Sequence, residues 1–188
     1  MSAEKLVVGL TGMPGAGKSV VVSVARANGY GIVVMGDEVR EEARKRGLEP
    51  TPENLGRIML ELRQLEGEAA IARRCIPKIL AKGESKVIVD GVRSLAEVEE
   101  FKRYFPRFTL IAVHASPEIR FKRLFHRQRS DDPKSWEIFH ERDMRELSVG
   151  LGNAIAMAEC MIVNEESLEA AKKQAAKILR KVEEKWMK

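Results

Sequence analysis

The sequence predicts an α/β fold of three layers, in which helices cover both faces of a five-stranded parallel sheet. Five short apolar runs alternate with longer helical stretches along the chain. The runs are apolar at successive rather than alternate positions, which is typical of strands buried on both faces. A length of 188 residues suits one such domain. Strands and helices that alternate in this way form parallel sheets with helices on each side.

The expected elements follow one another in a regular order. The strands are expected at residues 5–10, 32–35, 86–90, 108–114 and 161–164. The helices are expected at residues 18–28, 38–46, 53–81, 95–104, 117–127, 136–157 and 168–188. A bend at Gly67 and a polar loop over residues 130–135 interrupt the pattern. In a sheet of this kind, ligands bind outside the carboxyl ends of the strands.

The composition is that of a soluble globular protein, with 44% hydrophobic and 32% charged residues. A net charge of +5 suits anionic ligands without saying which. Cys75 and Cys160 are expected as two buried thiols, because they are far apart and lie in apolar stretches. No apolar run approaches the roughly 18 residues that span a bilayer, and a glycine-rich motif follows directly on the first apolar run. We therefore expect a cytoplasmic protein.

A phosphate-binding loop lies directly after the first expected strand. It matches the pattern G-x-x-x-x-G-K-[ST] (Walker A) at every position and consists of Gly12, Met13, Pro14, Gly15, Ala16, Gly17, Lys18 and Ser19. Glycines let the backbone curl into a ring of N–H donors, and the helix that follows adds its positive end. Lys18 is expected to reach the β- and γ-phosphates, and the Ser19 hydroxyl to bind Mg²⁺. The loop predicts a P-loop NTPase fold that binds a nucleoside triphosphate, although kinases, switches and transport ATPases all share it.

Charged residues at the ends of two other strands are candidates for the rest of the site. Asp90 ends the third expected strand, where a carboxylate lies beside the Mg²⁺ water shell, and Arg93 is placed for a phosphate contact. Asp37 and Arg40 follow the second strand, so Asp37 could accept a hydroxyl proton and Arg40 could bind a phosphate. The alternatives are an Asp-Gly turn at Asp90 and a helix-dipole carboxylate at Asp37, with Arg40 and Arg93 solvated.

Arginines gather in the segment after the fourth strand. Phosphoryl transfer needs cations that meet the charge of the equatorial oxygens, and mobile segments rich in arginine provide them. The alternative is a solvated helix face whose arginines pair locally with acidic neighbours, namely Glu118, Glu137, Glu141 and Asp143. The candidates are Arg120, Arg123, Arg127, Arg129, Arg142 and Arg145.

Together these residues resemble the nucleoside monophosphate kinases, in particular adenylate kinase and dephospho-CoA kinase, and more closely an archaeal adenylate-kinase-related family. The similarity covers nearly the whole chain. Gly36, Asp37 and Arg40 match the T-G-D-x-x-R segment of adenylate kinases, which implies that Arg40 holds the acceptor's phosphate. Asp90 matches their D-G-[FY]-P-R segment. Arg93 arrives one residue early and the proline is missing, which argues against a true AMP kinase.

The resemblance extends to a lid. Arg123 and Arg127 resemble the two arginines with which the adenylate kinase lid begins, the first of them against adenine. Arg129, together with Asp131, Asp132 and a later Arg142, resembles its closing R-x-D-D segment and implies cations around the transferred phosphoryl group. Asn164 lies where the family has its adenine-contacting turn.

The resemblance implies a single kinase domain over residues 1–188, with an acceptor arm at about 37–82 and a short lid at about 124–147. It implies transfer of the γ-phosphoryl group of MgATP to a small nucleotide-like acceptor, with ATP and Mg²⁺ as cofactors and Lys18, Asp37, Arg129 and Arg142 as catalytic residues. The main alternative is an ATP-hydrolysing switch or assembly factor that acts on protein or RNA. A sensor that binds nucleotides without turnover is a third possibility. The acceptor (AMP, CMP or dephospho-CoA among others) and the oligomeric state stay open.

Overall fold

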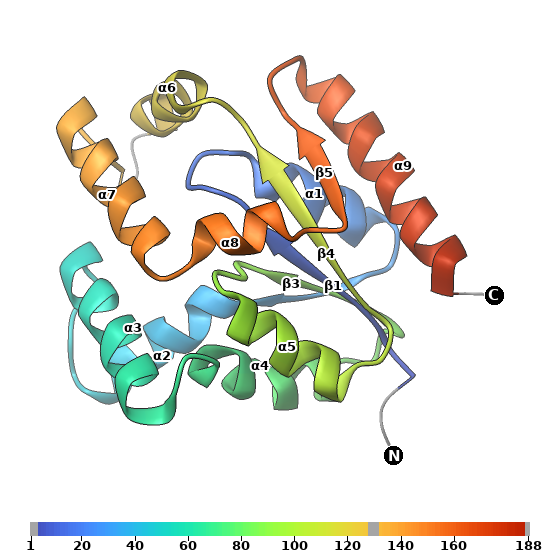
Figure 1. Cartoon of the computed structure of the whole chain (residues 1–188), viewed down its shortest axis with the longest axis horizontal. Helices are drawn as coiled ribbons and strands as arrows, with labels where there is room; N and C mark the ends of the chain where they lie inside the picture. The colour runs from blue at the N-terminus through green and yellow to red at the C-terminus, as the bar shows by residue number, and fades with distance from the viewer. Residues whose placement is uncertain (1–3, 128–131, 187–188) are drawn as a thin grey trace.

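The structure is a computed structural model that describes residues 4–127 and 132–186 (Figure 1). At its centre is a five-stranded sheet in the order β2-β3-β1-β4-β5, and every neighbouring pair of strands is parallel. The predicted fold class, an α/β fold with a five-stranded parallel sheet, is confirmed. The strands are β1 (Leu6–Thr11), β2 (Gly31–Val34), β3 (Lys86–Asp90), β4 (Phe108–His114) and β5 (Cys160–Val163).

Helices cover both faces of the sheet. On one face α9 lies beside α1, and the opposite face carries α4 and α5 (Figure 1). The helices are α1 (Lys18–Ala27), α2 (Met35–Lys45), α3 (Pro52–Glu66), α4 (Ala70–Ala81), α5 (Leu95–Tyr104), α6 (Pro117–Arg127), α7 (Trp136–Ser148), α8 (Leu151–Ala156) and α9 (Leu168–Trp186). No helix in the described part of the chain is long and apolar enough to cross a membrane.

The continuous apolar runs of the strands supply two separate cores. In β1, Val7 packs with the helices of the α4–α5 face, whereas Leu6, Val8 and Leu10 pack with α1 and α9. Successive side chains of a strand point to opposite faces, so an uninterrupted apolar sequence is required when both faces are covered. All six residues of β1 are buried.

Two expected helices are each divided into two. The helix predicted over residues 53–81 is α3 and α4, which meet at Gly67, where a bend was predicted and where φ is +91°. The helix predicted over residues 136–157 is α7 and α8, because Gly150 adopts a left-handed conformation with φ of +97°. Residues other than glycine avoid this region. Both glycines therefore end the preceding helix.

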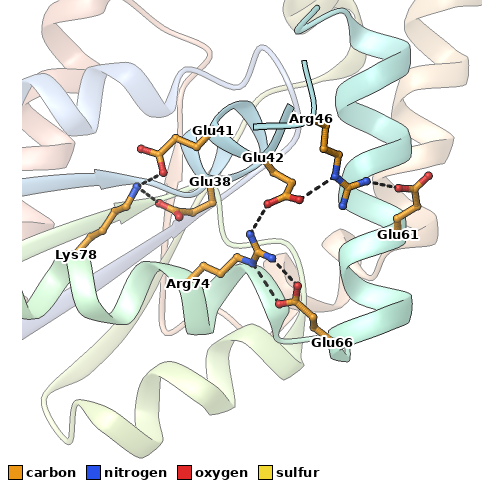
Figure 2. A network of polar contacts seen from close by, with 8 residues as sticks. All are labelled: Glu38, Glu41, Glu42, Arg46, Glu61, Glu66, Arg74 and Lys78. Atoms are coloured by element: carbon orange, nitrogen blue, oxygen red, sulfur yellow. Dashed lines mark hydrogen bonds and ion pairs between the residues drawn. The ribbon is translucent and has the colours of Figure 1, made fainter. Parts of the chain in front are cut away.

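Charged side chains link the three helices of the α2–α4 segment (Figure 2). Arg74 of α4 donates one hydrogen bond to Glu42 of α2 at 2.9 Å and two more to Glu66 at the end of α3. Arg46 joins Glu42 to Glu61 of α3. The network spans elements that are far apart in sequence, so it fixes how α3 sits on α2 and α4.

Arg74→Gln is expected to lower the free energy of unfolding by about 1–2 kcal/mol, because it removes charge-assisted hydrogen bonds to two carboxylates from a side chain that is only 27% exposed. Chemical denaturation measures the change. Arg57→Gln is the control, since Arg57 is 58% exposed and 3.7 Å from Glu61, and a change within about 0.5 kcal/mol is expected there. Equal effects of the two substitutions would show that the network does not hold the segment.

Candidate phosphoryl-transfer site

The phosphate loop joins β1 to α1 at the carboxyl end of the central strand. Gly12, Gly15 and Gly17 all have positive φ, at +144°, +81° and +97°. A Cβ atom would lie 2.3 Å from the Val113 carbonyl oxygen if built on Gly12, and 2.1 Å from Nδ2 of Asn164 if built on Gly17. Both the conformation and the close neighbours of the loop therefore require glycine at these positions.

Side chains from the far half of the chain hold the loop from outside. Asn164, which follows β5, is buried and donates from Nδ2 to the Ala16 carbonyl oxygen at 2.9 Å. Arg123 of α6 donates to the Asn164 carbonyl oxygen at 2.9 Å. Arg120 donates to the Pro14 carbonyl oxygen at 3.1 Å. The bonds from Asn164 and Arg120 use carbonyl oxygens of the loop and none of its N–H groups.

Arg120 is a structural residue. Its guanidinium makes two hydrogen bonds to the carboxylate of Asp143 on α7, at 2.9 and 2.6 Å, and both side chains are buried. For Arg120, the alternative interpretation is therefore correct: this arginine forms a local ion pair. Loss of one partner from such a pair leaves a buried charge uncompensated and costs several kcal/mol. The pair joins α6, α7 and the phosphate loop.

The first turn of α1 is built to receive an anion. Its N-cap is Gly17, which has no side chain to bond the helix N–H groups, whereas Ser94 and Ser135 supply such bonds to α5 and α7. Open N–H groups and the helix dipole together favour a phosphate. Ser19 lies in this turn with its residue exposed, as a hydroxyl ligand of Mg²⁺ would need to be.

Lys18 lies at the centre of the site. Its Nζ donates to the Gly12 carbonyl oxygen at 2.7 Å. Burial lowers its pKa to about 8, and Arg93 and Arg142 act in the same direction while Asp90 and Glu146 oppose them. A buried ammonium group with a lowered pKa gains from a nearby polyphosphate, because the phosphate charges replace the lost hydration.

Asp90 ends β3, directly beside Leu10 of β1. Its Oδ1 is buried and has no hydrogen-bond partner among the described residues. Burial raises the pKa of Asp90, although Lys18 and Arg93 act against this. No cluster of three or more metal-binding side chains occurs within residues 4–127 and 132–186. Because Mg²⁺ in phosphate sites is held by one or two protein oxygens together with phosphates and waters, Asp90 and Ser19 fit that ion.

Arg93 lies beside Lys18 but is held by a carboxylate that the sequence reasoning missed. Its Nε donates to Glu146 of α7 at 2.8 Å, and its Nη1 donates to the Gly91 carbonyl oxygen at 3.1 Å. Burial raises the pKa of Glu146, but Arg93, Arg142 and Lys18 together outweigh it and lower the pKa, so Glu146 is a carboxylate. The sequence offers one indication that Glu146 faces the site: it lies one helical turn after Arg142, so the two side chains share a face of the helix.

The residues that are predicted to bind and orient the acceptor lie on α2. Asp37 and Arg40 form an exposed ion pair at 2.8 Å, and the charge of Asp37 acts on Asp90. The structure therefore brings Asp37 to the side of the site where β2 and β3 end. The roles of Asp37 and Arg40 toward an acceptor stay predictions.

The structure describes some of the predicted lid residues but not all of them. Arg127 donates from Nε to Asp132 at 2.9 Å. Arg142 lies close enough to Lys18 and Glu146 to affect both pKa values. Arg129, which was predicted to be catalytic, lies outside the described residues, as does Asp131.

Comparison with known proteins agrees with this geometry. A family model described as an AAA domain matches residues 11–140. A UPF0200 protein of Hyperthermus butylicus is 50% identical over 177 residues, which cover 94% of this chain and 95% of that protein. A UPF0200 protein of Methanocaldococcus jannaschii is 48% identical over 179 residues, which cover 94% of this chain and 90% of the relative.

The chain belongs to the UPF0200 family. Solved structures with this fold include TT1252 from Thermus thermophilus, with a TM-score of 0.67, 20% identity and coverage of 95% of this chain and 98% of that one. A shikimate kinase from Acinetobacter baumannii gives a TM-score of 0.59 at 19% identity, with 99% of this chain and 97% of that one covered. The predicted likeness to P-loop kinases and to an archaeal family is confirmed.

Gly17→Ala is expected to weaken ATP binding. Strain at positive φ and displacement of Asn164 together cost about 3 kcal/mol, which corresponds to about a hundredfold in affinity. Titration calorimetry measures the change. Gly29→Ala is the matched control, because Gly29 also has positive φ, at +78°, but nothing lies within 4 Å of its added Cβ. Equal losses of affinity in both variants would contradict the role of the Asn164 contact.

ATP affinity is expected to fall as the pH rises through about 8. Above this pH free Lys18 is increasingly neutral, while bound phosphate favours its charged form, so binding takes up a proton. Calorimetry at pH 9 in buffers of different ionisation enthalpy would detect that uptake. In Lys18→Arg the guanidinium keeps its charge and the proton uptake should disappear. An ATP affinity of the wild type that is constant from pH 7 to 9.5 would refute the assignment.

Proposed function

We propose that the protein is a kinase that transfers the γ-phosphoryl group of MgATP to a small nucleotide-like acceptor. The observation that carries this proposal is the convergence of charged groups on Lys18. Arg93 and Asp90 come from the end of β3, and Arg142 and Glu146 come from α7. A protein that only senses nucleotides has no need of cations around the γ-phosphate, whereas phosphoryl transfer depends on them.

Each group has a place in the proposed reaction. Lys18 and the loop N–H groups bind the β- and γ-phosphates, and Ser19 and Asp90 hold Mg²⁺, which supplies charge neutralisation on the phosphate oxygens when bound. Arg142, with Arg129 from the segment outside the described residues, meets the charge on the equatorial oxygens. Arg123, Arg127 and Asn164 are the proposed adenine side, where Asn164 lies against the loop.

The acceptor oxygen attacks the γ-phosphorus atom in line with the leaving group. A bond forms between that oxygen and phosphorus, and the bond from phosphorus to the β–γ bridging oxygen breaks, which releases ADP. If the acceptor is a hydroxyl, its proton passes to Asp37 and then to solvent. Arg40 orients the acceptor. The α2–α4 segment would form the acceptor arm, and residues 124–147 the lid.

Two of the solved structures support a small acceptor. The shikimate kinase from Acinetobacter baumannii is in complex with shikimate, and a gluconokinase from Sinorhizobium meliloti shares the fold with a TM-score of 0.58 at 18% identity. Both names describe kinases of small molecules. Since the fold alone is shared at this identity, the acceptor of this chain must be found by experiment.

A panel of nucleotides, nucleosides and coenzyme precursors, incubated with ATP and Mg²⁺, is expected to contain a compound that raises ADP release well above hydrolysis in water.

The Arg142→Ala variant should keep an ATP affinity near that of the wild type. Its turnover should fall by about 10³-fold, because the guanidinium of Arg142 acts on the transition state. Arg103→Ala, an exposed arginine of α5 that is remote from the site, is the control.

Stimulation by RNA or a protein, with no response to any small molecule, would favour an ATP-hydrolysing switch instead. Unchanged turnover in Arg142→Ala would remove that residue from the mechanism.

A further inference from the structure

We infer that the acceptor presents an uncharged hydroxyl to the γ-phosphoryl group rather than a phosphate, and that Glu146 enforces this choice. The inference rests on the proposed kinase function and names the chemical class of its acceptor. It follows from how the cations beside Lys18 are already engaged, from the charges there, and from the groove that adjoins them.

Arg93 is the cation that a phosphate acceptor would be expected to use, and it is already engaged. Glu146 accepts a hydrogen bond from its Nε at 2.8 Å, the Gly91 carbonyl oxygen accepts one from its Nη1, and Glu97 accepts one from its main-chain N–H at 2.7 Å. The attraction of Glu146 raises the pKa of Arg93, so the pair is fully ionised. Glu146 thus takes the place of an acceptor phosphate at this arginine.

Glu146 is not a surface carboxylate that can swing away at little cost. Its side chain is only 14% exposed, and behind Arg93 lies a second ion pair, between Arg63 and the fully buried Glu97 at 2.6 Å. Removing Glu146 from Arg93 would leave this partly buried guanidinium, whose side chain is 29% exposed, facing the positive charge of Lys18 without its carboxylate. Separation of the pair therefore has a cost, which favours a contact that persists when substrates bind.

Charges of both signs surround Lys18 before any substrate arrives. Arg93 and Arg142 lower its pKa, whereas the carboxylates of Asp90 and Glu146 raise it. A second phosphate, with up to two further negative charges, would have to lie beside the Glu146 carboxylate. Like charges in a site of low dielectric repel strongly, which selects against such an acceptor. A hydroxyl group carries no such penalty.

A groove of about 480 Å³ adjoins the Arg93–Glu146 pair, and its walls combine uncharged polar and apolar residues with two charged ones, Glu68 and Arg63, of which Arg63 is paired with Glu97. Ser94 follows Arg93 directly, and Ser148 lies two residues after Glu146, so the groove continues from the pair. Its amide and hydroxyl side chains suit a neutral polar body, such as a sugar ring or a base, of the size that clefts of this volume hold. Besides the two serines, the uncharged polar groups of the lining are Gln64 and Asn153.

Hydroxyl and phosphate acceptors can be distinguished by the type of product that they form. Attack by a hydroxyl gives ADP and a phosphate monoester, whereas attack by a phosphate gives ADP and a diphosphate. Phosphorus NMR distinguishes them, because the transferred phosphoryl group gives an uncoupled signal in a monoester, whereas in a diphosphate it is coupled to a second phosphorus atom, as in ADP itself. The panel consists of matched pairs of nucleosides and their 5′-monophosphates, with hydroxy acids and dephospho-CoA added, each with the wild-type protein, ATP and Mg²⁺.

A new uncoupled monoester signal is the expected result. A diphosphate formed from a monophosphate would overturn the hydroxyl assignment and leave the kinase proposal standing. The absence of transfer to every compound, with hydrolysis driven by a macromolecule instead, would overturn the kinase proposal and this inference with it.

Binding tests the role of Glu146 without turnover. AMP and CMP are titrated into protein saturated with Mg²⁺ and a non-hydrolysable ATP analogue, so that the phosphate loop is already occupied. Glu146→Gln should bind them about tenfold or more tightly than the wild type, because the neutral amide no longer offsets the charge of Arg93 or repels the phosphate. Glu141→Gln, which makes the same change at an exposed position of α7, should leave the affinity unchanged. Unaltered or weaker binding by Glu146→Gln would refute the role of Glu146.

Discussion

The shape of one loop backbone controls the rest of the site. Gly12, Gly15 and Gly17 give the phosphate loop conformations that other residues avoid, and a loop of that kind does not keep its shape unaided. Its carbonyl groups accept hydrogen bonds from Asn164 and from Arg120 and Arg123 of α6. The loop is thus preorganised by groups that do not face the ligand, and its N–H groups need little rearrangement when phosphate arrives. Preorganised donors of this kind are the main source of electrostatic catalysis.

The charged groups of the site are also arranged before a ligand binds. Lys18 is desolvated, and Asp90 and Glu146 offset the positive charges around it. In the proposed reaction, a further negative charge would have to lie near these carboxylates. The charges of the site, and not its size alone, would then separate anionic from neutral acceptors.

The fold and the phosphate loop could be predicted because their signals are local. A strand, a glycine-rich loop and a helix occur within one continuous segment, and the uninterrupted apolar runs reveal a sheet covered on both faces. The break at Gly150 was missed because a glycine within a helical pattern is often tolerated, and only the left-handed conformation shows that the helix ends there. The pairing of Arg93 with Glu146 joins residues 53 positions apart. No local pattern reports such a pair, so the sequence alone predicts an Arg93 that is available to a ligand.

Asn164 comes late in a chain whose phosphate loop comes early. During translation the loop leaves the ribosome long before β5, α9 and the asparagine that braces it have been synthesised. Central β1 also lacks its neighbours β3 and β4 at that stage. A nascent chain therefore carries the Walker sequence without the finished phosphate loop, which acquires its braced form only in the complete polypeptide.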